Sequence, residues 1–219
     1  MPARPARNQW VAISDTAWQG LAATAPDAQA RDILAHWQAR CLPLVVCTQP
    51  PGLEPGRLAL GLPAPLRWSR RRLALQVPRH QVLRQGEFPP LATVLQDEAS
   101  QALAHALAAL EADARVYGSY GWQALTGEPY VHAASDIDLR IQVPGFAVAC
   151  LALPLLQPAR LPGRLDGEFT FAQGHAIAWR EFAHLLHAEQ PAAQVLVKSL
   201  GAPRLMPAAW VRQLGLAAA

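Results

Sequence analysis

Polar and apolar residues alternate from Asp136 to Val143, and this stretch constrains the fold more than any other part of the sequence. Alternation with a period of two predicts a half-buried β-strand, because successive side chains of a strand point to opposite faces. Ile137 then points into a core, while Asp136 and Asp138 leave the opposite face together. The sequence therefore predicts a sheet that carries two neighbouring carboxylates on one face.

Proline and glycine divide the chain into short segments, and the sequence from Gly86 to Pro90 is typical of a domain boundary. Before it, short strands and a helix over 25–39 predict a mixed α/β domain over residues 1–86. After it, an apolar stripe that begins at Leu91 predicts one long helix that ends near Asp113. Further strands are expected near residues 115–117, 137–143, 164–171, 176–180 and 195–199. We therefore predict an α+β fold, with a smaller N-terminal α/β region and a mixed sheet with helices over residues 87–219.

Composition argues against several classes of protein. Hydrophobic residues make up 52% of the chain and charged residues 16%, so the chain can bury a core and is not expected to be disordered. A net charge of +3 is too small to predict a nucleic-acid-binding surface by itself, and no apolar run is long enough to span a membrane. Three cysteines without a CxxC pair argue against a disulfide framework or a zinc site. We expect a cytoplasmic protein with neither nucleic acid nor membrane as a partner.

The aspartate pair predicts a metal site. Asp136 and Asp138 on one face would repel each other, and a divalent cation such as Mg²⁺, which prefers one or two carboxylates plus phosphate oxygens, would relieve that repulsion. Gly118-Ser119 follows a short strand, where glycine lets the backbone approach a phosphate and serine can donate to it. Each feature alone is equally typical of an exposed strand edge or a plain turn. Their combination predicts metal-dependent phosphoryl transfer.

A third carboxylate would complete such a site. Asp166 and Glu168 are two apart on a later predicted strand, so they share a face. Either could bind the metal or act as a base toward an attacking hydroxyl, and a hairpin with outward polar residues is the alternative. We favour Asp166.

Basic and aromatic residues supply candidate contacts to a substrate. Arg70, Arg71 and Arg72 could bind a triphosphate or an acidic partner, or simply form a solvated strand end. Lys198 ends an apolar strand, from which it could reach a phosphate or cover apolar surface with its stem. Trp122 is the tryptophan that we expect near the site.

These motifs resemble a known family. The Gly-Ser pair with the Asp-x-Asp pair resembles the nucleotidyltransferase superfamily that includes DNA polymerase beta and the aminoglycoside nucleotidyltransferases. The longer strings over 118–127 and 135–139 resemble the malonate decarboxylase holo-acyl carrier protein synthases, also called phosphoribosyl-dephospho-CoA transferases. The segments over 164–168, 179–181 and 195–198 agree with the same family, and so do parts of the N-terminal half.

The resemblance implies a polymerase-beta-like fold and a specific reaction. The donor would be 2′-(5″-triphosphoribosyl)-3′-dephospho-CoA, the acceptor a serine of the acyl carrier protein subunit of malonate decarboxylase, and the leaving group pyrophosphate. By position, Asp136 and Asp138 would bind Mg²⁺, Gly118 and Ser119 would hold the triphosphate, and Asp166 would help to activate the serine.

Other functions remain open at this point. A nucleotidyltransferase that acts on a small molecule is one alternative, and a catalytically silent binding protein of the same fold is another. The related citrate lyase transferase would differ in its acceptor. Because carrier proteins are typically acidic, the cluster over 70–72 would favour a carrier as the acceptor.

Overall fold

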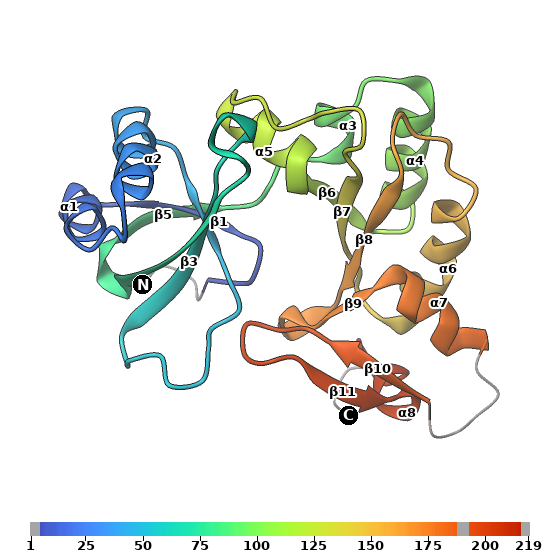
Figure 1. Ribbon diagram of the computed structural model, residues 1–219. Coiled ribbons are helices and arrows are strands. Elements are labelled where there is room, and N and C mark those ends of the chain that lie inside the picture. The colour runs from blue at the N-terminus through green and yellow to red at the C-terminus, as the bar shows by residue number, and fades with distance from the viewer. Residues whose placement is uncertain (1–4, 188–192, 216–219) are drawn as a thin grey trace. The chain divides into compact units, whose positions relative to one another are not determined.

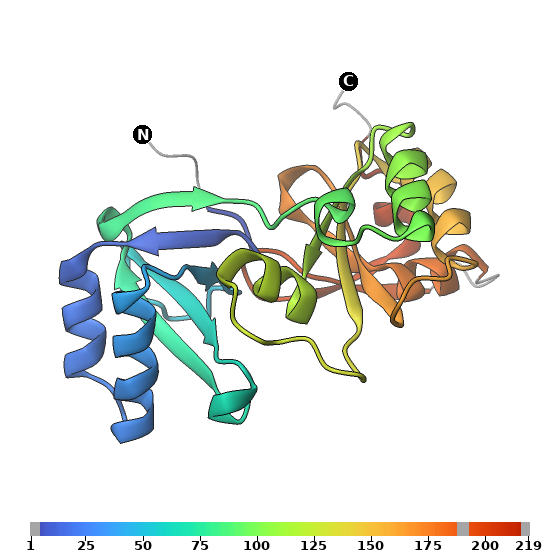
Figure 2. The same cartoon turned by 90° about the horizontal axis from the view of Figure 1, so that it is seen from above.

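The computed structural model describes residues 5–187 and 193–215 of the 219-residue chain. The chain forms a mixed α+β fold, as the sequence predicts (Figure 1, Figure 2). The chain divides into two compact units. The N-terminal unit contains residues 1–88, 126–130 and 200–202, and the C-terminal unit contains residues 89–125, 131–199 and 203–219. Among the described residues, no helix combines the length and the apolar character needed to cross a membrane.

The N-terminal unit is an antiparallel sheet covered by two helices. Its strands are β1 (Trp10–Ile13), β2 (Leu44–Val46), β3 (Arg57–Pro63), β4 (Arg72–Pro78) and β5 (Val82–Gly86), in the order β4-β3-β2-β1-β5. Helices α1 (Asp15–Ala23) and α2 (Ala28–Ala39) begin at the caps Ser14 and Asp27, whose side chains accept hydrogen bonds from backbone amides of the first turn. The predicted helix over 25–39 is thus confirmed as α2. Trp37 of α2 is fully buried against the sheet, and its Nε1 donates to the carbonyl of Pro43 at 3.2 Å.

A buried carboxylate holds residues 126–130 within the N-terminal unit. Glu128 is 2% exposed, and its carboxylate accepts a hydrogen bond from Arg40 and forms an ion pair with Arg67, whose Nη2 lies 3.0 Å from Oε2. The ring of His36 lies 2.8 Å from the same carboxylate. Burial of an ionised carboxylate is costly unless it is paired, so the two arginines are what allow Glu128 to be buried.

The C-terminal unit is built on a mixed four-stranded sheet in the order β6-β7-β8-β9. The strands are β6 (Asp113–Tyr117), β7 (Ile137–Gln142), β8 (Leu165–Thr170) and β9 (Ala176–Ala178), and only the pair β7–β8 is parallel. Helix α6 (Phe146–Leu156) makes the crossover between those two strands. One face of the sheet is apolar and packs into the core of the unit, so the alternate residues, including Asp138, lie on the other face.

The remaining elements of this unit are helices and a hairpin. The helices are α3 (Leu91–Val94), α4 (Glu98–Ala108), α5 (Gly118–Thr126), α7 (Trp179–His187) and α8 (Ala208–Val211). Strands β10 (Gln194–Val197) and β11 (Arg204–Pro207) form a separate two-stranded antiparallel sheet. Short 3₁₀ turns lie over 66–68, 79–81 and 172–174.

The single long helix predicted from Leu91 to near Asp113 is wrong. The structure divides it into α3 and α4, and Asp97 caps α4 by accepting from the amide of Ser100 at 3.0 Å and from its hydroxyl at 2.6 Å. A capping aspartate starts a new helix because it satisfies amides that have no partner within the helix. The apolar stripe spans both helices, so periodicity alone does not reveal the break.

Gly167 is the residue that permits the close pairing of β7 and β8. Its φ of +144° is a conformation that L-residues rarely adopt, and a Cβ added there would lie 1.9 Å from the carbonyl oxygen of Leu139 on β7. A side chain at this position would therefore push the two parallel strands apart.

We expect Gly167→Ala to lower the free energy of unfolding by about 3 kcal/mol or more, because backbone strain and a clash with backbone add together. Gly174→Ala is the matched control, since Gly174 also has a positive φ, of +76°, but has open space around its Cα. That variant should lose only about 1 kcal/mol. Urea unfolding of both variants checks this, and equal losses would contradict the role given to Gly167.

Candidate active site

The strand register brings two of the three predicted carboxylates together. Asp138 on β7 pairs directly with Asp166 on the parallel strand β8. Side chains at paired positions leave the same face of a sheet, and neighbouring strands lie about 4.8 Å apart. Asp138 and Asp166 are therefore neighbours on the polar face, which is the arrangement expected of an aspartate pair that shares a cation.

The start of α5 lies against the carboxylate of Asp138. Helix α5 follows β6 directly, and its first residue, Gly118, has a φ of +59°. A Cβ at Gly118 would lie 1.8 Å from Oδ2 of Asp138, so only glycine fits beside this carboxylate. Ser119 follows in the first turn, while Trp122, one turn later, is 6% exposed. The structure thus brings Gly118 and Asp138 together, and the amides at the start of α5 offer donors to an anion.

Asp136 forms an ion pair with Arg164, which was not predicted from the sequence as a residue of the site. Arg164 donates from Nε to Oδ1 of Asp136 at 2.8 Å and from Nη2 to Oδ2 at 2.5 Å. These two hydrogen bonds are the main reason that the pKa of Asp136 lies below its ordinary value. Arg164 stands two residues before Asp166, and that spacing is the one available signal that the two side chains share a face.

A second arginine stands near Asp166. The Nε of Arg180 lies 3.8 Å from Oδ1 of Asp166, and the same oxygen accepts a hydrogen bond from the amide of Gly167 at 2.8 Å. Arg180 is itself held in place, because its Nη2 donates to the carbonyl of Leu165 at 2.7 Å and its guanidinium lies 4.3 Å from the ring centre of Trp179. Its role at the site, like that of Arg164, was not predicted from the sequence.

Among the described interactions, no arginine makes a hydrogen bond or an ion pair with the carboxylate of Asp138. Its pKa is raised to about 6, first by burial and then by the negative charges of Asp166 and Asp136. A divalent cation would favour the ionised form, and Mg²⁺ needs only one or two carboxylates when phosphate oxygens complete its shell. Asp138 and Asp166 fit that requirement in donor type and in placement. Over residues 5–187 and 193–215, no three His, Cys, Asp or Glu side chains form a ready cluster for a metal.

Glu168, the alternative third carboxylate, is paired elsewhere. It is 2% exposed, and its Oε2 lies 3.8 Å from Nζ of Lys198. Its strand neighbour on β7 is Arg140, which is also buried. Lys198, proposed from sequence as a phosphate contact, therefore faces a buried carboxylate in this structure.

The three arginines over 70–72 belong to the N-terminal unit and differ from one another. Arg71 is paired within the N-terminal unit, because it donates to both carboxylate oxygens of Asp27 at 2.8 and 2.6 Å and to Gln29 at 2.8 Å. Arg70 and Arg72 are exposed. The sequence cluster thus leaves two of its three cations directed to solvent.

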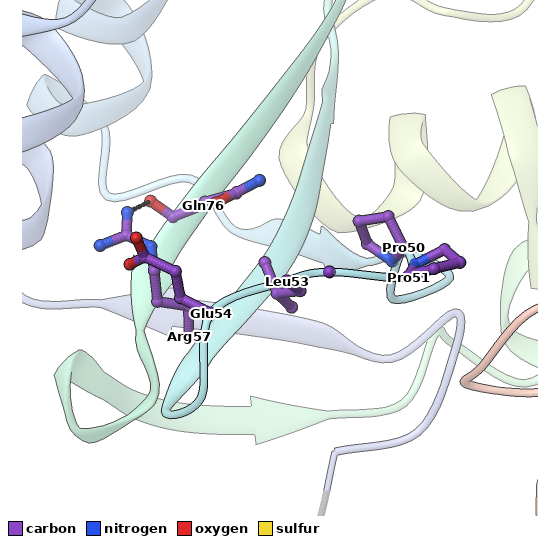
Figure 3. A pocket seen from close by; sticks show the side chains of 7 residues that line it. Pro50, Pro51, Leu53, Glu54, Arg57 and Gln76 are labelled. Carbon is purple, nitrogen blue, oxygen red and sulfur yellow. Dashed lines mark hydrogen bonds between the residues drawn. The ribbon is translucent and has the colours of Figure 1, made fainter.

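The N-terminal unit has two hollows, of which the second is lined in part by Arg71 and Arg72. One, of about 540 Å³, is lined by the loop over 50–54 with Arg57 and Gln76, and Arg57 donates to the carbonyl of Gln76 at 2.9 Å (Figure 3). The other, of about 320 Å³, is lined by Arg57, Arg71, Arg72 and apolar residues of α1, α2 and β4. The sequence predicts neither hollow, because each is assembled from segments far apart in the chain.

The raised pKa of Asp138 has a measurable consequence for stability. A folded-state pKa of about 6, above the ordinary 3.8, means that the native state binds this proton more tightly than the unfolded chain. The associated stabilisation is fully present below about pH 4 and is lost as the pH rises through about 6. We therefore expect Asp138→Asn, measured in chelator, to be more stable than wild type by about 1 kcal/mol at about pH 7.5, a value reduced for the partial exposure of the carboxyl.

The stability that Asp138→Asn gains over wild type should vanish toward pH 4, as measured by thermal or urea unfolding. Asp136→Asn is the matched control, because it loses two hydrogen bonds from Arg164 and should not become more stable at about pH 7.5. Equal stabilisation by both variants would contradict the assignment of electrostatic strain to Asp138.

Comparison with known proteins identifies the family. Models of the phosphoribosyl-dephospho-CoA transferase MdcG C-terminal and N-terminal domains match residues 86–209 and 6–88. A phosphoribosyl-dephospho-CoA transferase of Xanthomonas axonopodis pv. citri (strain 306) is 40% identical over 208 residues, which cover 89% of this chain and 90% of the relative. A protein of the same name from Bradyrhizobium diazoefficiens is 32% identical over 213 residues, with coverage of 90% and 87%. No solved structure matches the chain significantly. The chain is therefore a transferase that belongs to the phosphoribosyl-dephospho-CoA transferase MdcG family.

Proposed function

We propose that this transferase moves the 5″-phosphoribosyl-3′-dephospho-CoA group from 2′-(5″-triphosphoribosyl)-3′-dephospho-CoA to a serine of the acyl carrier protein subunit of malonate decarboxylase. The family supports the transferred group, since both matched domains carry the name phosphoribosyl-dephospho-CoA transferase. The observation that carries the mechanism is the pairing of Asp138 with Asp166 beside Gly118. Carboxylates that hold a metal ion and amides that bind phosphate can together stabilise the charge that develops in a reaction at a phosphorus atom.

The reaction assigns a role to each element of the site. The amides at the start of α5, with Gly118 and Ser119, hold the triphosphate of the donor. The serine oxygen of the carrier bonds to the α-phosphorus, while the bond from that phosphorus to the bridging oxygen of pyrophosphate breaks. Asp166 accepts the serine proton, and pyrophosphate leaves with its electron pair. Asp136 and Asp138, with Asp166, are the residues that would hold Mg²⁺, which supplies positive charge for the attacking and leaving oxygens.

The arrangement also supports a nucleotidyltransferase fold of the polymerase-beta type for the C-terminal unit. A strand leads through a glycine into a helix, and the aspartate pair lies at the start of the next strand, with Asp136 directly before β7 and Asp138 on it. A third carboxylate then stands on the neighbouring strand. The likeness is one of local order and register, since no solved structure matches the whole chain.

The surface charge of the N-terminal unit favours an acidic carrier protein as the acceptor. Arg70 and Arg72 are exposed on the N-terminal unit, and Leu66 nearby in the chain is 57% exposed. Acidic carrier proteins complement such a surface, and charge complementarity acts mainly on encounter and specificity. Arg71 contributes little to this surface because Asp27 neutralises it.

Transfer of the prosthetic group to the purified carrier, followed by mass spectrometry and a pyrophosphate assay, tests the proposal. We expect wild type to release one pyrophosphate per carrier modified and to need Mg²⁺. Asp166→Asn should lower the rate by at least about 100-fold, about 2.7 kcal/mol, because it removes the proton acceptor. Glu168→Gln, compared under conditions where it remains folded, should lose far less rate, since Glu168 faces Lys198. Release of phosphate in place of pyrophosphate, or a larger loss of rate in Glu168→Gln than in Asp166→Asn, would contradict the proposal. Transfer to a small molecule but not to the carrier would show that the proposed acceptor is wrong.

Charge reversal on the N-terminal unit tests the acceptor surface. We expect the double variant Arg70→Glu with Arg72→Glu to raise the KM for the carrier at low ionic strength and to flatten its salt dependence, because charge steering is screened by salt. Arg79→Glu, at the other end of β4, is the control and should leave that KM near the wild-type value. If both proteins keep wild-type kinetics toward the carrier, Arg70 and Arg72 form only a solvated strand end.

A further inference from the structure

Asp136, predicted as a metal ligand, is occupied by Arg164 in a bidentate pair. Both oxygens of the carboxylate receive a hydrogen bond, at 2.8 and 2.5 Å. The two residues directly precede β7 and β8, where the amide of Ile137 donates to the carbonyl of Arg164 at 2.9 Å. The strand pairing therefore fixes the two side chains at the same end of the parallel pair.

Stability does not account for this ion pair. The side chain of Arg164 is 69% exposed and that of Asp136 is 31% exposed. Ion pairs at such exposed positions contribute about 0–1 kcal/mol, because solvent screens them and ordering two side chains costs entropy. The pair occupies both oxygens of a carboxylate that lies two residues from Asp138.

The guanidinium of Arg164 has a second suitable partner in the proposed reaction. The planar fork of arginine that matches a carboxylate also matches a phosphate. Its exposure leaves the head of the side chain free to move without unpacking the core. An incoming triphosphate would offer new acceptors for the guanidinium at the time when a cation needs the oxygens of Asp136.

We propose that Arg164 is an exchange residue, paired with Asp136 in the donor-free protein and transferred to the donor's phosphates when a divalent cation takes Asp136. This inference rests on the proposed function. This exchange makes the binding of the cation and of the triphosphate mutually dependent. The cation releases Arg164 for the phosphates, and the phosphates release Asp136 for the cation, so the coupling is reciprocal. Arg164 is then a specificity residue for the polyphosphate chain of the donor.

The test uses Mn²⁺ alone as the cation probe and inorganic tripolyphosphate as the phosphate probe, with the full-length protein. Electron paramagnetic resonance measures free Mn²⁺, and calorimetry measures tripolyphosphate binding with Mn²⁺ present. We expect Arg164→Gln to bind Mn²⁺ alone about fivefold more tightly than wild type, because Asp136 is released. The same variant should bind tripolyphosphate at least about fivefold more weakly, because the guanidinium is missing.

Arg212→Gln is the matched control, since Arg212 is exposed directly after α8 and its charge acts on the thiol of Cys150 on α6. It removes the same charge but no partner of Asp136, so both affinities should stay near wild type. Arg164→Lys keeps the charge without the fork and should lie between wild type and Arg164→Gln. Thermal unfolding of each variant checks that the fold is retained, as the exposure of Arg164 leads us to expect.

The outcomes separate this inference from the function on which it rests. If wild type binds Mn²⁺ in a manner that Asp138→Asn abolishes, but Arg164→Gln changes neither affinity, the exchange is overturned and the proposed function stands. Weaker Mn²⁺ binding by Arg164→Gln, or unchanged tripolyphosphate binding, overturns the exchange as well. If wild type binds no Mn²⁺ even with tripolyphosphate, the metal-dependent function fails and the exchange fails with it.

Discussion

The parallel pairing of β7 with β8 is the constraint on which the candidate site depends. It sets Asp138 beside Asp166, and it sets Asp136 and Arg164 at the same end of the two strands. Parallel strands need a crossover connection, and α6 supplies it on the apolar face, which leaves the polar face to the carboxylates. Because Gly167 lets the two backbones approach, the geometry of the carboxylates rests on a residue without a side chain.

Electrostatic strain is the consequence of that pairing. Burial first, and then the negative charges of Asp166 and Asp136, raise the pKa of Asp138, while Arg164 and Arg180 lie beside the other two carboxylates. The arginines limit the strain without removing it, because neither contacts Asp138 among the described interactions. The divalent cation that we propose for this site would relieve the remaining electrostatic strain.

The strands of the sheet were predictable because they depend on the alternation of polar and apolar residues and on the prolines and glycines between segments. Alternation over 137–143 predicted β7, and the two strands near 164–171 and 176–180 were found as β8 and β9. The break between α3 and α4 was missed because one apolar stripe continues across Asp97, and only the capping bond to Ser100 distinguishes the two helices. The pairing order of the strands could not be predicted, since it depends on contacts between distant segments rather than on local pattern.

The same distinction explains which site residues the sequence revealed. Two aspartates separated by one residue on a strand share a face whatever their surroundings, so Asp136 and Asp138 could be recognised as a pair from local spacing alone. The spacing of Arg164 and Asp166 indicates only that the two share a face, and the partner of the long arginine side chain is set by the tertiary register. Arg71 and Arg164 illustrate this: each is held bidentately, one by a helix-capping aspartate and one by an aspartate of the site. The sequence places Arg71 in a basic run and leaves Arg164 isolated, yet it is Arg164 that pairs with a carboxylate of the candidate site. The number of neighbouring charges in a sequence therefore says little about which arginine lies at the site.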